Sequence, residues 1–180
     1  MKLINWKDDF LKRVVIIGAG ASGMLAAKVA SDRGYKVIVL EKQKRCGQKL
    51  LITGKGRCNI TNNCEIEELI ENVPTNGKFL YSAFYTFTND QVIDMFNDLG
   101  VETKTERGKR VFPVSDKAVD VVRALEKQMR SNKNVEVLLN SKVDKIEAQD
   151  GKVKKVILSD KREIECDSVI VATGGVSYPR

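Results

Sequence analysis

Six residues near the start of the chain have the spacing of a loop that binds nucleotide phosphates. The run Gly18-Ala19-Gly20-Ala21-Ser22-Gly23 fits G-x-G-x-x-G. In this pattern the first glycine allows a tight turn, the second lets backbone approach a pyrophosphate, and the third lets a helix pack on a strand. Glu41 follows Gly23 by 18 residues, where a carboxylate can accept hydrogen bonds from ribose hydroxyls. The spacing predicts a dinucleotide site, and the carboxylate disfavours NADP because it would face the 2′-phosphate.

The elements that must position this loop are recognisable on both sides of it. Residues 13–17 form a short β-branched run, typical of a buried parallel strand. Residues 21–33 are small and apolar with helical spacing, and a second apolar run over 36–40 ends at Glu41. Strand, helix and strand within about thirty residues predict a βαβ unit. A glycine-rich turn that binds nothing is the competing explanation, and the agreement of these features disfavours it.

The rest of the pattern divides into helices and short strands. Helical spacing covers 65–72, 89–99 and 115–131, with Ser115 as the cap of the last helix. Strand-like runs cover 135–139, 143–148, 152–158 and 168–172. Asp150-Gly151 between the middle two runs is a strong hairpin signal, and a short helix is expected around Trp6 and Phe10. The predicted fold class is α/β: a Rossmann-like FAD/NAD(P)-binding fold with a parallel sheet, plus an antiparallel β hairpin.

Composition excludes several kinds of chemistry. Histidine is absent from the 180 residues, which removes Ser-His-Asp and Cys-His catalysis and every His-ligated metal site. The four cysteines lack C-x-x-C spacing, so we expect no metal and no thioredoxin-type chemistry, but the reduced thiols of a cytoplasmic protein. No run approaches the ~18 apolar residues that span a bilayer, so no membrane partner is expected. No pair of acids and no Tyr-Lys pair identifies a catalytic residue, which stays unknown.

A basic segment follows the second predicted strand. Six Lys and Arg residues and no acidic residue occur here, at Lys42, Lys44, Arg45, Lys49, Lys55 and Arg57. The segment could place positive charge over cofactor phosphates or be a solvated surface, and we favour the second reading for Lys44 and Arg45. Lys49, Lys55 and Arg57 lie around glycines that let backbone approach a ligand, which makes them better site candidates.

Three further stretches resemble the signatures of one flavoprotein family. Residues 48–62 (QKLLITGKGRCNITN) are similar to the K-L-L-I-S-G-G-G-R-C-N-x-T-N motif of BaiN-like (YhiN-type) flavoproteins, also described as aminoacetone oxidase-like. The stretches 108–115 (GKRVFPVS) and 172–179 (ATGGVSYP) match the same family. With the glycine fingerprint, four ordered motifs cover nearly the whole chain. Thr53 stands for serine and Lys55 for the middle glycine, and a lysine argues against tight φ > 0 geometry there.

The resemblance implies an FAD-dependent oxidoreductase and gives roles to named residues. The FAD pyrophosphate would lie at the fingerprint, including Ser22, with Glu41 on a ribose. Along the cofactor would lie Lys42, Lys49, Gly56, Arg57, Cys58 and Asn59. Val143 would offer its backbone to the adenine, and Ala172, Thr173 and Gly174 would close the site. For Cys58 we favour a packing thiol over a disulfide with Cys64, because the spacing of the two departs from C-x4-C.

The resemblance also carries expectations about the whole protein. Relatives run to roughly twice this length, so residues 1–180 are expected to be one FAD-binding domain. It would be the N-terminal portion, without the family's substrate domain and C-terminal FAD segment. NAD(P)H is the transient electron donor that the family suggests, although no second G-x-G-x-x-G is present to bind it.

Two other function classes remain open. An NAD-dependent dehydrogenase shares the fingerprint and Glu41 but leaves Arg57-Cys58-Asn59 unexplained, and cofactor preference separates it from a flavoprotein. A tRNA-associated FAD protein or nucleic-acid-binding module is suggested by the net charge of +7. Nucleic acid is disfavoured, because the basic residues cluster near the predicted phosphate site and only 6% aromatic residues offer few stacking platforms. A small-molecule substrate is therefore expected, and the sequence does not determine the oligomeric state.

Overall fold

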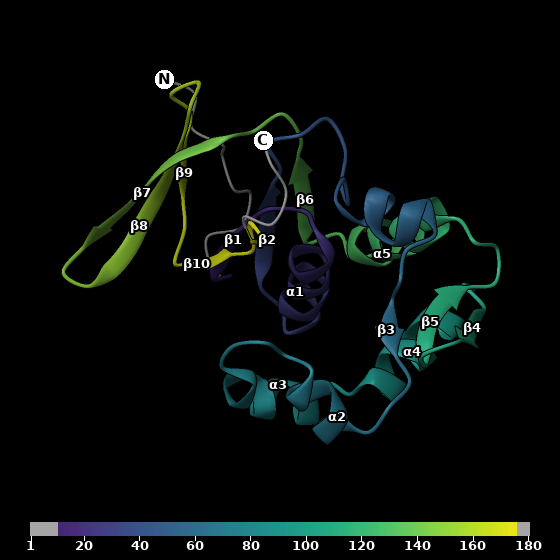
Figure 1. Ribbon diagram of the computed structural model, residues 1–180. Helices are drawn as coiled ribbons and strands as arrows, with labels where there is room; N and C mark the ends of the chain where they lie inside the picture. Colours follow the sequence, from purple (N-terminus) through teal and green to yellow (C-terminus); the bar gives the residue numbers. More distant parts are fainter. Residues whose placement is uncertain (1–10, 176–180) are drawn as a thin grey trace. The chain divides into compact units, whose positions relative to one another are not determined.

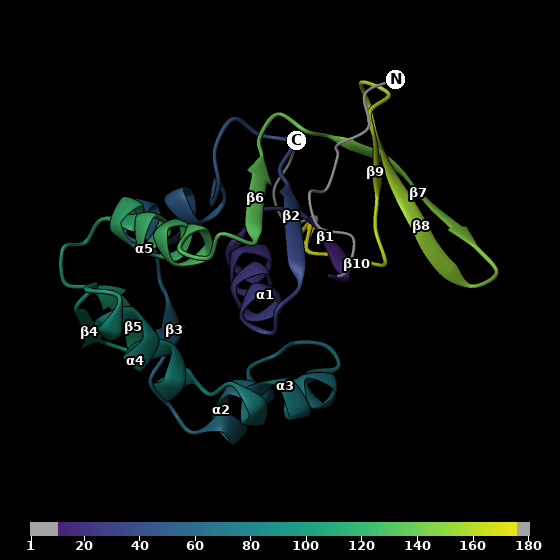
Figure 2. The same cartoon turned by 180° about the vertical axis from the view of Figure 1, so that it is seen from behind.

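The computed structural model describes residues 11–175 in two compact units (Figures 1 and 2). Of the described residues, 11–49 and 125–175 belong to the first unit, and the second comprises Leu50–Ala124. The helix expected around Trp6 and Phe10 lies outside the described residues. The assignment of residues 1–180 to one FAD-binding domain stays a prediction.

The first unit is built on a four-stranded parallel sheet. β1 (Arg13–Ile17) pairs with β2 (Lys36–Leu40) on one side and with β10 (Ser168–Val171) on the other, and β6 (Val135–Leu138) pairs with β2. The predicted βαβ unit is confirmed, since α1 (Ala21–Asp32) connects β1 to β2 and packs against both, as Figure 1 shows. The Rossmann-like fold class is thereby confirmed.

Both faces of this sheet are covered. Val15, Ile38 and Leu40 belong to an apolar cluster completed by Val156, Leu158 and Ile164 of a second sheet and by Cys166, which follows that sheet's last strand. Because successive strand residues point to opposite faces, Ile16 and Val39 lie on the other face, where α1 packs. Burial on both faces is the physical reason that β1 and β2 read as continuous apolar runs rather than alternating ones.

The second sheet of this unit is antiparallel and has three strands. β7 (Val143–Gln149) pairs with β8 (Lys152–Leu158), and β8 pairs with β9 (Glu163–Glu165). The predicted hairpin is confirmed: Asp150 and Gly151 have φ of +53° and +71°, the two positive values that a type I′ turn needs. β9 was not predicted, because three residues are too few for a periodic signal.

The second unit contains a small antiparallel sheet. Its strands lie in the order β3-β5-β4, with bounds Thr61–Asn62 for β3, Arg110–Pro113 for β5 and Thr103–Glu106 for β4. They run antiparallel, and Thr105 and Thr61 both align with Val111 of the central strand. These two- and four-residue strands were not predicted.

Short helices complete the second unit. The predicted helices at 65–72 and 89–99 are confirmed as α2 (Ile66–Glu71) and α4 (Asn89–Asp98). α4 begins at Thr88, whose side chain accepts from the Gln91 N–H while the Gln91 side chain accepts from the Thr88 N–H. Between them lie two unpredicted helices, η2 (Gly77–Leu80) and α3 (Tyr81–Thr86).

The boundary between the units falls within α5 (Ala118–Arg130). The predicted apolar positions of this helix are all buried: Ala118, Val121, Val122, Leu125 and Met129. Ser115 is not its cap, because the helix begins three residues later. The Ser115 hydroxyl instead accepts from the Lys117 N–H at 3.4 Å and donates to Asp120 at 2.7 Å. In the part of the chain that the structure describes, no helix has the length and apolar character needed to cross a membrane.

Candidate functional site

The glycine fingerprint forms the turn from β1 into α1, and its first glycine is required by the fold. Gly18 has φ +105°, a conformation that side chains rarely adopt. A Cβ built on Gly18 would lie 2.5 Å from the carbonyl oxygen of Ala172. The Gly18 N–H donates to the Leu40 carbonyl at 2.8 Å. The turn is therefore held between the ends of β2 and β10.

The other two glycines have opposite surroundings. A Cβ on Gly23 would lie 1.9 Å from the Gly18 carbonyl oxygen, so the first turn of α1 packs directly on the loop. Among residues 11–175, no atom would lie within 4 Å of a Cβ built on Gly20, and the φ of Gly20, −80°, suits any residue. No side chain caps α1 at Gly20. Open space beside uncapped N–H groups at a helix N-terminus fits an anionic pyrophosphate.

Glu41 lies at the end of β2, 9% exposed, and its carboxylate holds the loop. Oε2 accepts from the Ala19 N–H at 2.8 Å, and Oε1 accepts from the Gln43 N–H at 2.8 Å. Each carboxylate oxygen has capacity for a further bond, so these contacts leave acceptors for a ribose hydroxyl. The sequence did not predict that Glu41 would tie the β1 loop to β2.

The residues after β10 and before β7 also lie close to this loop. The Ala172 N–H donates to the Ile17 carbonyl at 2.9 Å, and the Thr173 Cα would lie 3.3 Å from a Cβ on Gly18. Gly174 follows with φ +74°. Val143 begins β7 just after Ser141, whose N–H donates to the Glu41 carbonyl at 2.8 Å. The structure thus brings the fingerprint, Glu41 and the residues after β10 together at the carboxyl ends of the parallel strands, with the segment before Val143 bonded to Glu41.

The basic segment contacts the fingerprint through its backbone. The Gly47 N–H donates to the Ala19 carbonyl at 2.8 Å. Lys42 and Lys49 are exposed on either side of this contact. Beside Gly47, the Cys46 thiol is buried, and burial raises its pKa to about 11. This thiol is therefore a packing group rather than a thiolate.

The remaining candidates belong to the second unit, where η1 (Leu50–Gly56) ends in a left-handed turn. Gly54, Lys55 and Gly56 have φ of +56°, +59° and +84°. The expectation that Lys55 opposes positive φ is wrong. The turn is closed by the Arg57 N–H donating to the Gly54 carbonyl and the Cys58 N–H donating to the Thr53 carbonyl, at 3.2 and 3.1 Å. These bonds and the flanking glycines hold Lys55 in this conformation.

Arg57 has carboxylate partners that sequence reasoning missed. Its Nε donates to Asp116 Oδ1 at 2.8 Å, and its Nη2 donates to Glu106. The guanidinium carbon lies 4.2 Å from the centre of the Phe112 ring. Arg57 lowers the pKa of the Glu106 carboxyl, and Lys104 and then Arg57 lower the pKa of Asp116. The available signal was the 108–115 motif, which contains Phe112 and ends beside Asp116.

Cys58 and Asn59 complete this segment. Cys58 has φ +62° and is 1% exposed, and burial raises the pKa of its thiol. It is free, as are the other three cysteines. Asn59 is exposed, and with its amide oriented to donate it bridges the carbonyls of Val111 and Thr61 at 3.2 and 3.1 Å. Both residues are thus held by the second unit's own backbone.

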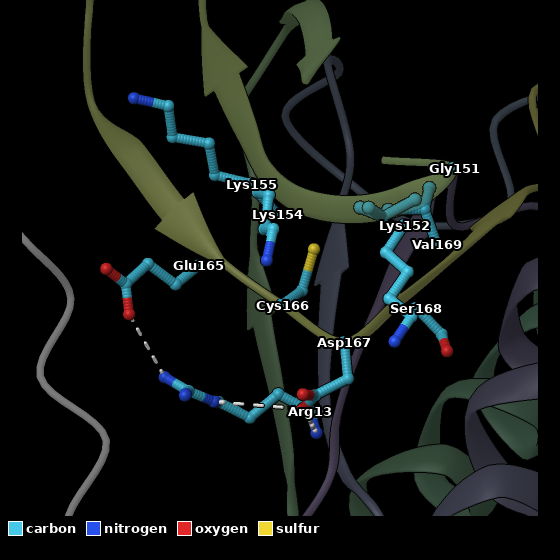
Figure 3. Close-up of a pocket in the computed structure, with 11 residues that line it drawn as sticks. Arg13, Gly151, Lys152, Lys154, Lys155, Glu165, Cys166, Asp167, Ser168 and Val169 are labelled. Atoms are coloured by element: carbon cyan, nitrogen blue, oxygen red, sulfur yellow. Dashed lines mark hydrogen bonds and ion pairs between the residues drawn. The ribbon is translucent and has the colours of Figure 1, made fainter. Parts of the chain in front are cut away.

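A pocket in the first unit lies away from the fingerprint (Figure 3). It has a volume of about 740 Å³ and opens between β8 and the start of β10. Arg13 lies at its lower side, with an ion pair to Glu165 at 3.5 Å. Arg13 and Ser168 are the first residues of their parallel strands, whereas Gly18 follows the last residue of β1. The pocket and the loop therefore lie at opposite ends of the strands. The pocket is no part of the predicted cofactor site.

Comparison with known proteins decides the family. Residues 12–180 match the model of the HI0933-like protein Rossmann domain. The chain belongs to the HI0933-like family. This confirms the resemblance found in the motifs: the family is one of flavoprotein oxidoreductases, and membership implies FAD as the cofactor.

Curated relatives of this HI0933-like chain are longer. It is 34% identical over 167 residues to 3-dehydro-bile acid delta(4,6)-reductase of Clostridium scindens, covering 92% of this chain and 39% of the relative. It is 30% identical over 172 residues to ribosomal RNA dihydrouridine synthase of Haemophilus influenzae, and the match covers 92% of this chain and 41% of the relative. The protein of the same name from Escherichia coli is 32% identical, with 92% and 40% covered. The chain spans about two fifths of the length of these relatives.

Solved structures share the fold. A flavocytochrome c3 fumarate reductase matches with a TM-score of 0.68 at 22% identity, covering 94% of this chain and 34% of that one. Sdh1 of Mycobacterium smegmatis in the apo form matches with a TM-score of 0.68 at 20% identity, covering 92% and 35%. At such identities the likeness concerns the fold alone.

Proposed function

We propose that this chain binds FAD at the loop after β1 and forms the cofactor-binding part of a flavin-dependent reductase. The observation that carries the proposal is the contrast among the fingerprint glycines. Gly18 and Gly23 are crowded by the fold, whereas among the described residues the space beside Gly20 is open and no side chain caps the helix that begins there. A glycine at this position leaves the backbone open to a close approach by a pyrophosphate, which is the use that the fingerprint makes of its second glycine.

Under this proposal each candidate residue has a binding role. The N–H groups of Gly20 to Gly23 hold the pyrophosphate, Glu41 accepts from a ribose hydroxyl, and the Val143 backbone faces the adenine. Lys42 and Lys49 place positive charge near the phosphates, and Ala172 to Gly174 close the site. Gly56, Arg57, Cys58 and Asn59 are assigned to the cofactor by the family motif. Bound FAD supplies hydride transfer, so the chain has to bind and orient it rather than provide a nucleophile.

The relatives' names suggest the reaction class. The names of two relatives, 3-dehydro-bile acid delta(4,6)-reductase and ribosomal RNA dihydrouridine synthase, both denote reactions that form a reduced product. We infer the same class for the whole protein: substrate, NAD(P)H and H⁺ yield the reduced product and NAD(P)⁺. NAD(P)H is the proposed transient electron donor.

The test is a titration of the purified chain with FAD and, under identical conditions, with NAD. Saturable FAD binding with little NAD binding is the expected result. NAD binding alone would instead support a dehydrogenase. Absence of binding to either would refute cofactor binding by this chain.

A second candidate substrate is RNA, since two relatives are named for ribosomal RNA. The scarcity of aromatic residues argued against it, but the structure changes that argument. Five of the eleven aromatic residues fall within positions 79–87, and Phe79 and Tyr81 are 86% and 53% exposed. Exposed rings of this kind can stack on bases.

A further inference from the structure

Two sequence motifs meet in the second unit. Residues 53–59, called the 53–59 loop here, lie against β5, which belongs to the 108–115 motif. The Ile60 N–H donates to the Val111 carbonyl at 2.8 Å. A Cβ on Gly54 would lie 3.1 Å from Cε1 of Phe112, so the loop backbone rests on that ring. Arg57 lies over the same ring at 4.2 Å.

Charged groups tie the loop to β4 and to the segment after β5. Arg57 binds both Glu106 and Asp116, and its Nη2 lies 2.6 Å from Asp116 Oδ1. Lys104 closes the network, with Nζ 2.8 Å from Asp116 and 3.4 Å from Glu106. Two cations thus alternate with two anions, so Arg57 is held from two sides at once.

The loop needs such support because of its backbone. Positive φ occurs at Gly54, Lys55, Gly56 and Cys58, four of five consecutive residues. Lys55 and Cys58 carry side chains, which makes this conformation unfavourable unless the surroundings fix it. Arg57 lies between Lys55 and Cys58 in the sequence, so contacts that fix Arg57 restrict the backbone of both residues.

We propose that Glu106 and Asp116 are positioning residues, which hold Arg57 on Phe112 and thereby fix the 53–59 loop for the cofactor. The inference rests on the proposed FAD function, because the loop is a cofactor segment only if FAD binds. The contacts occupy Nε and Nη2 of Arg57, and within the described chain Nη1 makes no hydrogen bond. Arg57 can therefore be anchored and still offer one nitrogen to a ligand.

The alternative is that this network is an ordinary surface ion-pair cluster. Exposed salt bridges often contribute little to stability. A stability measurement would not separate the two explanations, so the readout must report on the loop itself. Cys58 provides it: its thiol is buried at 1% exposure and follows Arg57 directly.

The experiment measures iodoacetamide labelling of Cys58 in the folded full chain, with peptides quantified by mass spectrometry. The variant combines Glu106→Gln and Asp116→Asn, which keep shape and remove charge. Cys46, equally buried in the first unit, is the internal reference. Glu68→Gln, which breaks the 2.6 Å pair with Lys109 elsewhere in the second unit, is the matched control. FAD affinity is measured on the same proteins.

In the double variant we expect the labelling of Cys58 to accelerate about tenfold relative to that of Cys46, and the affinity for FAD to fall. The Glu68→Gln control should show neither change. Wild-type chain in 1 M NaCl should show the same acceleration, because salt screens exposed pairs, and this arm needs no variant to fold. Unchanged labelling in both arms overturns the proposal. Faster labelling with unchanged FAD affinity overturns the positioning role. If wild type binds no FAD, the proposed function fails, and labelling alone then decides whether Glu106 and Asp116 hold the loop.

Discussion

At the scale of single residues, the glycines of the fingerprint separate folding from binding. Gly20→Ala places a methyl group in open space, and alanine is a poorer cap than glycine, so we expect a loss of less than about 1 kcal/mol in unfolding free energy. FAD affinity should nevertheless fall at least about tenfold, because the methyl group would occupy the proposed path of the pyrophosphate.

Gly23→Ala is the matched variant. Its Cβ would lie 1.9 Å from a carbonyl oxygen, so the backbone must move, and we expect a loss of about 2–3 kcal/mol or more. Chemical denaturation and FAD titration of both proteins check the pair. Full FAD affinity in Gly20→Ala would mean that the open space is not the phosphate site.

Lys55 is a second residue whose conformation carries a prediction. Its φ of +59° costs a non-glycine residue about 1–2 kcal/mol, whereas glycine adopts it freely. Allowing for the larger entropy of glycine in the unfolded chain, Lys55→Gly should stabilise the protein by about 0.5–1 kcal/mol. Lys44→Gly, at an exposed position outside the positive-φ residues, should instead be neutral or destabilising. Equal effects of the two substitutions on denaturation midpoints would contradict the assigned backbone.

The residues of the site differ in how far sequence could locate them. Gly18, Gly23 and Glu41 were found because their backbone requirements and spacing are local. The hydrogen bond from the Ala19 N–H to the Glu41 carboxylate was not predicted, because it joins residues that are 22 positions apart. Glu106 and Asp116 were missed for the same reason: a carboxylate 49 or 59 residues from Arg57 has no signature in a single sequence.

At the scale of elements, predictability followed length and burial. β1, α1 and β2 were predicted closely because buried parallel strands and a close-packed helix need continuous apolar residues. β3, β4 and β9 are only two to four residues long and mostly polar, so no period could appear. α3 is six residues of mainly aromatic and small side chains, none of them buried, and therefore has no apolar stripe to recognise.

The network that joins the 53–59 loop to β4 should respond to acid. The pKa values of Glu106 and Asp116 are lowered from ordinary values of 4.5 and 3.8. A lowered carboxyl pKa contributes stability that is present above the unfolded value and is lost as pH falls through the folded value. Arg57 and Lys104 stay protonated throughout, so only the carboxylates change charge.

We therefore expect the wild type to have a higher melting temperature at pH 7 than the Glu106→Gln and Asp116→Asn double variant. The difference in melting temperature between the two proteins should disappear as pH falls below about 4.5 towards 3. Glu71→Gln, at the exposed end of α2, provides a control that should not reproduce this convergence. Melting curves at half-unit pH steps measure it. A gap that persists at pH 3 would show that the carboxylate charges do not stabilise the fold.

At the scale of the whole molecule, charge is unevenly distributed along the chain. The net charge is +7, yet residues 65–90 contain five acidic residues and one lysine, Lys78. The exposed aromatic residues Phe79 and Tyr81 belong to this acidic stretch, whereas the basic segment 42–57 contains no acid. RNA phosphates and stacked bases would therefore favour different parts of the chain.

This separation lets one gel-shift series distinguish non-specific attraction from an RNA substrate. Each phosphate contact to single-stranded nucleic acid contributes about 0.7 to the slope of log affinity against log salt. Lys44→Glu with Arg45→Glu should lower the slope by about 1.4 if the basic segment alone attracts RNA, and Phe79→Ser should change nothing. We expect that result, with binding lost by 200 mM salt, because the sequence favours a small-molecule substrate over nucleic acid. Binding of a ribosomal RNA fragment that survives 200 mM salt and weakens in Phe79→Ser would overturn it, because base stacking on the acidic stretch would then outweigh phosphate repulsion.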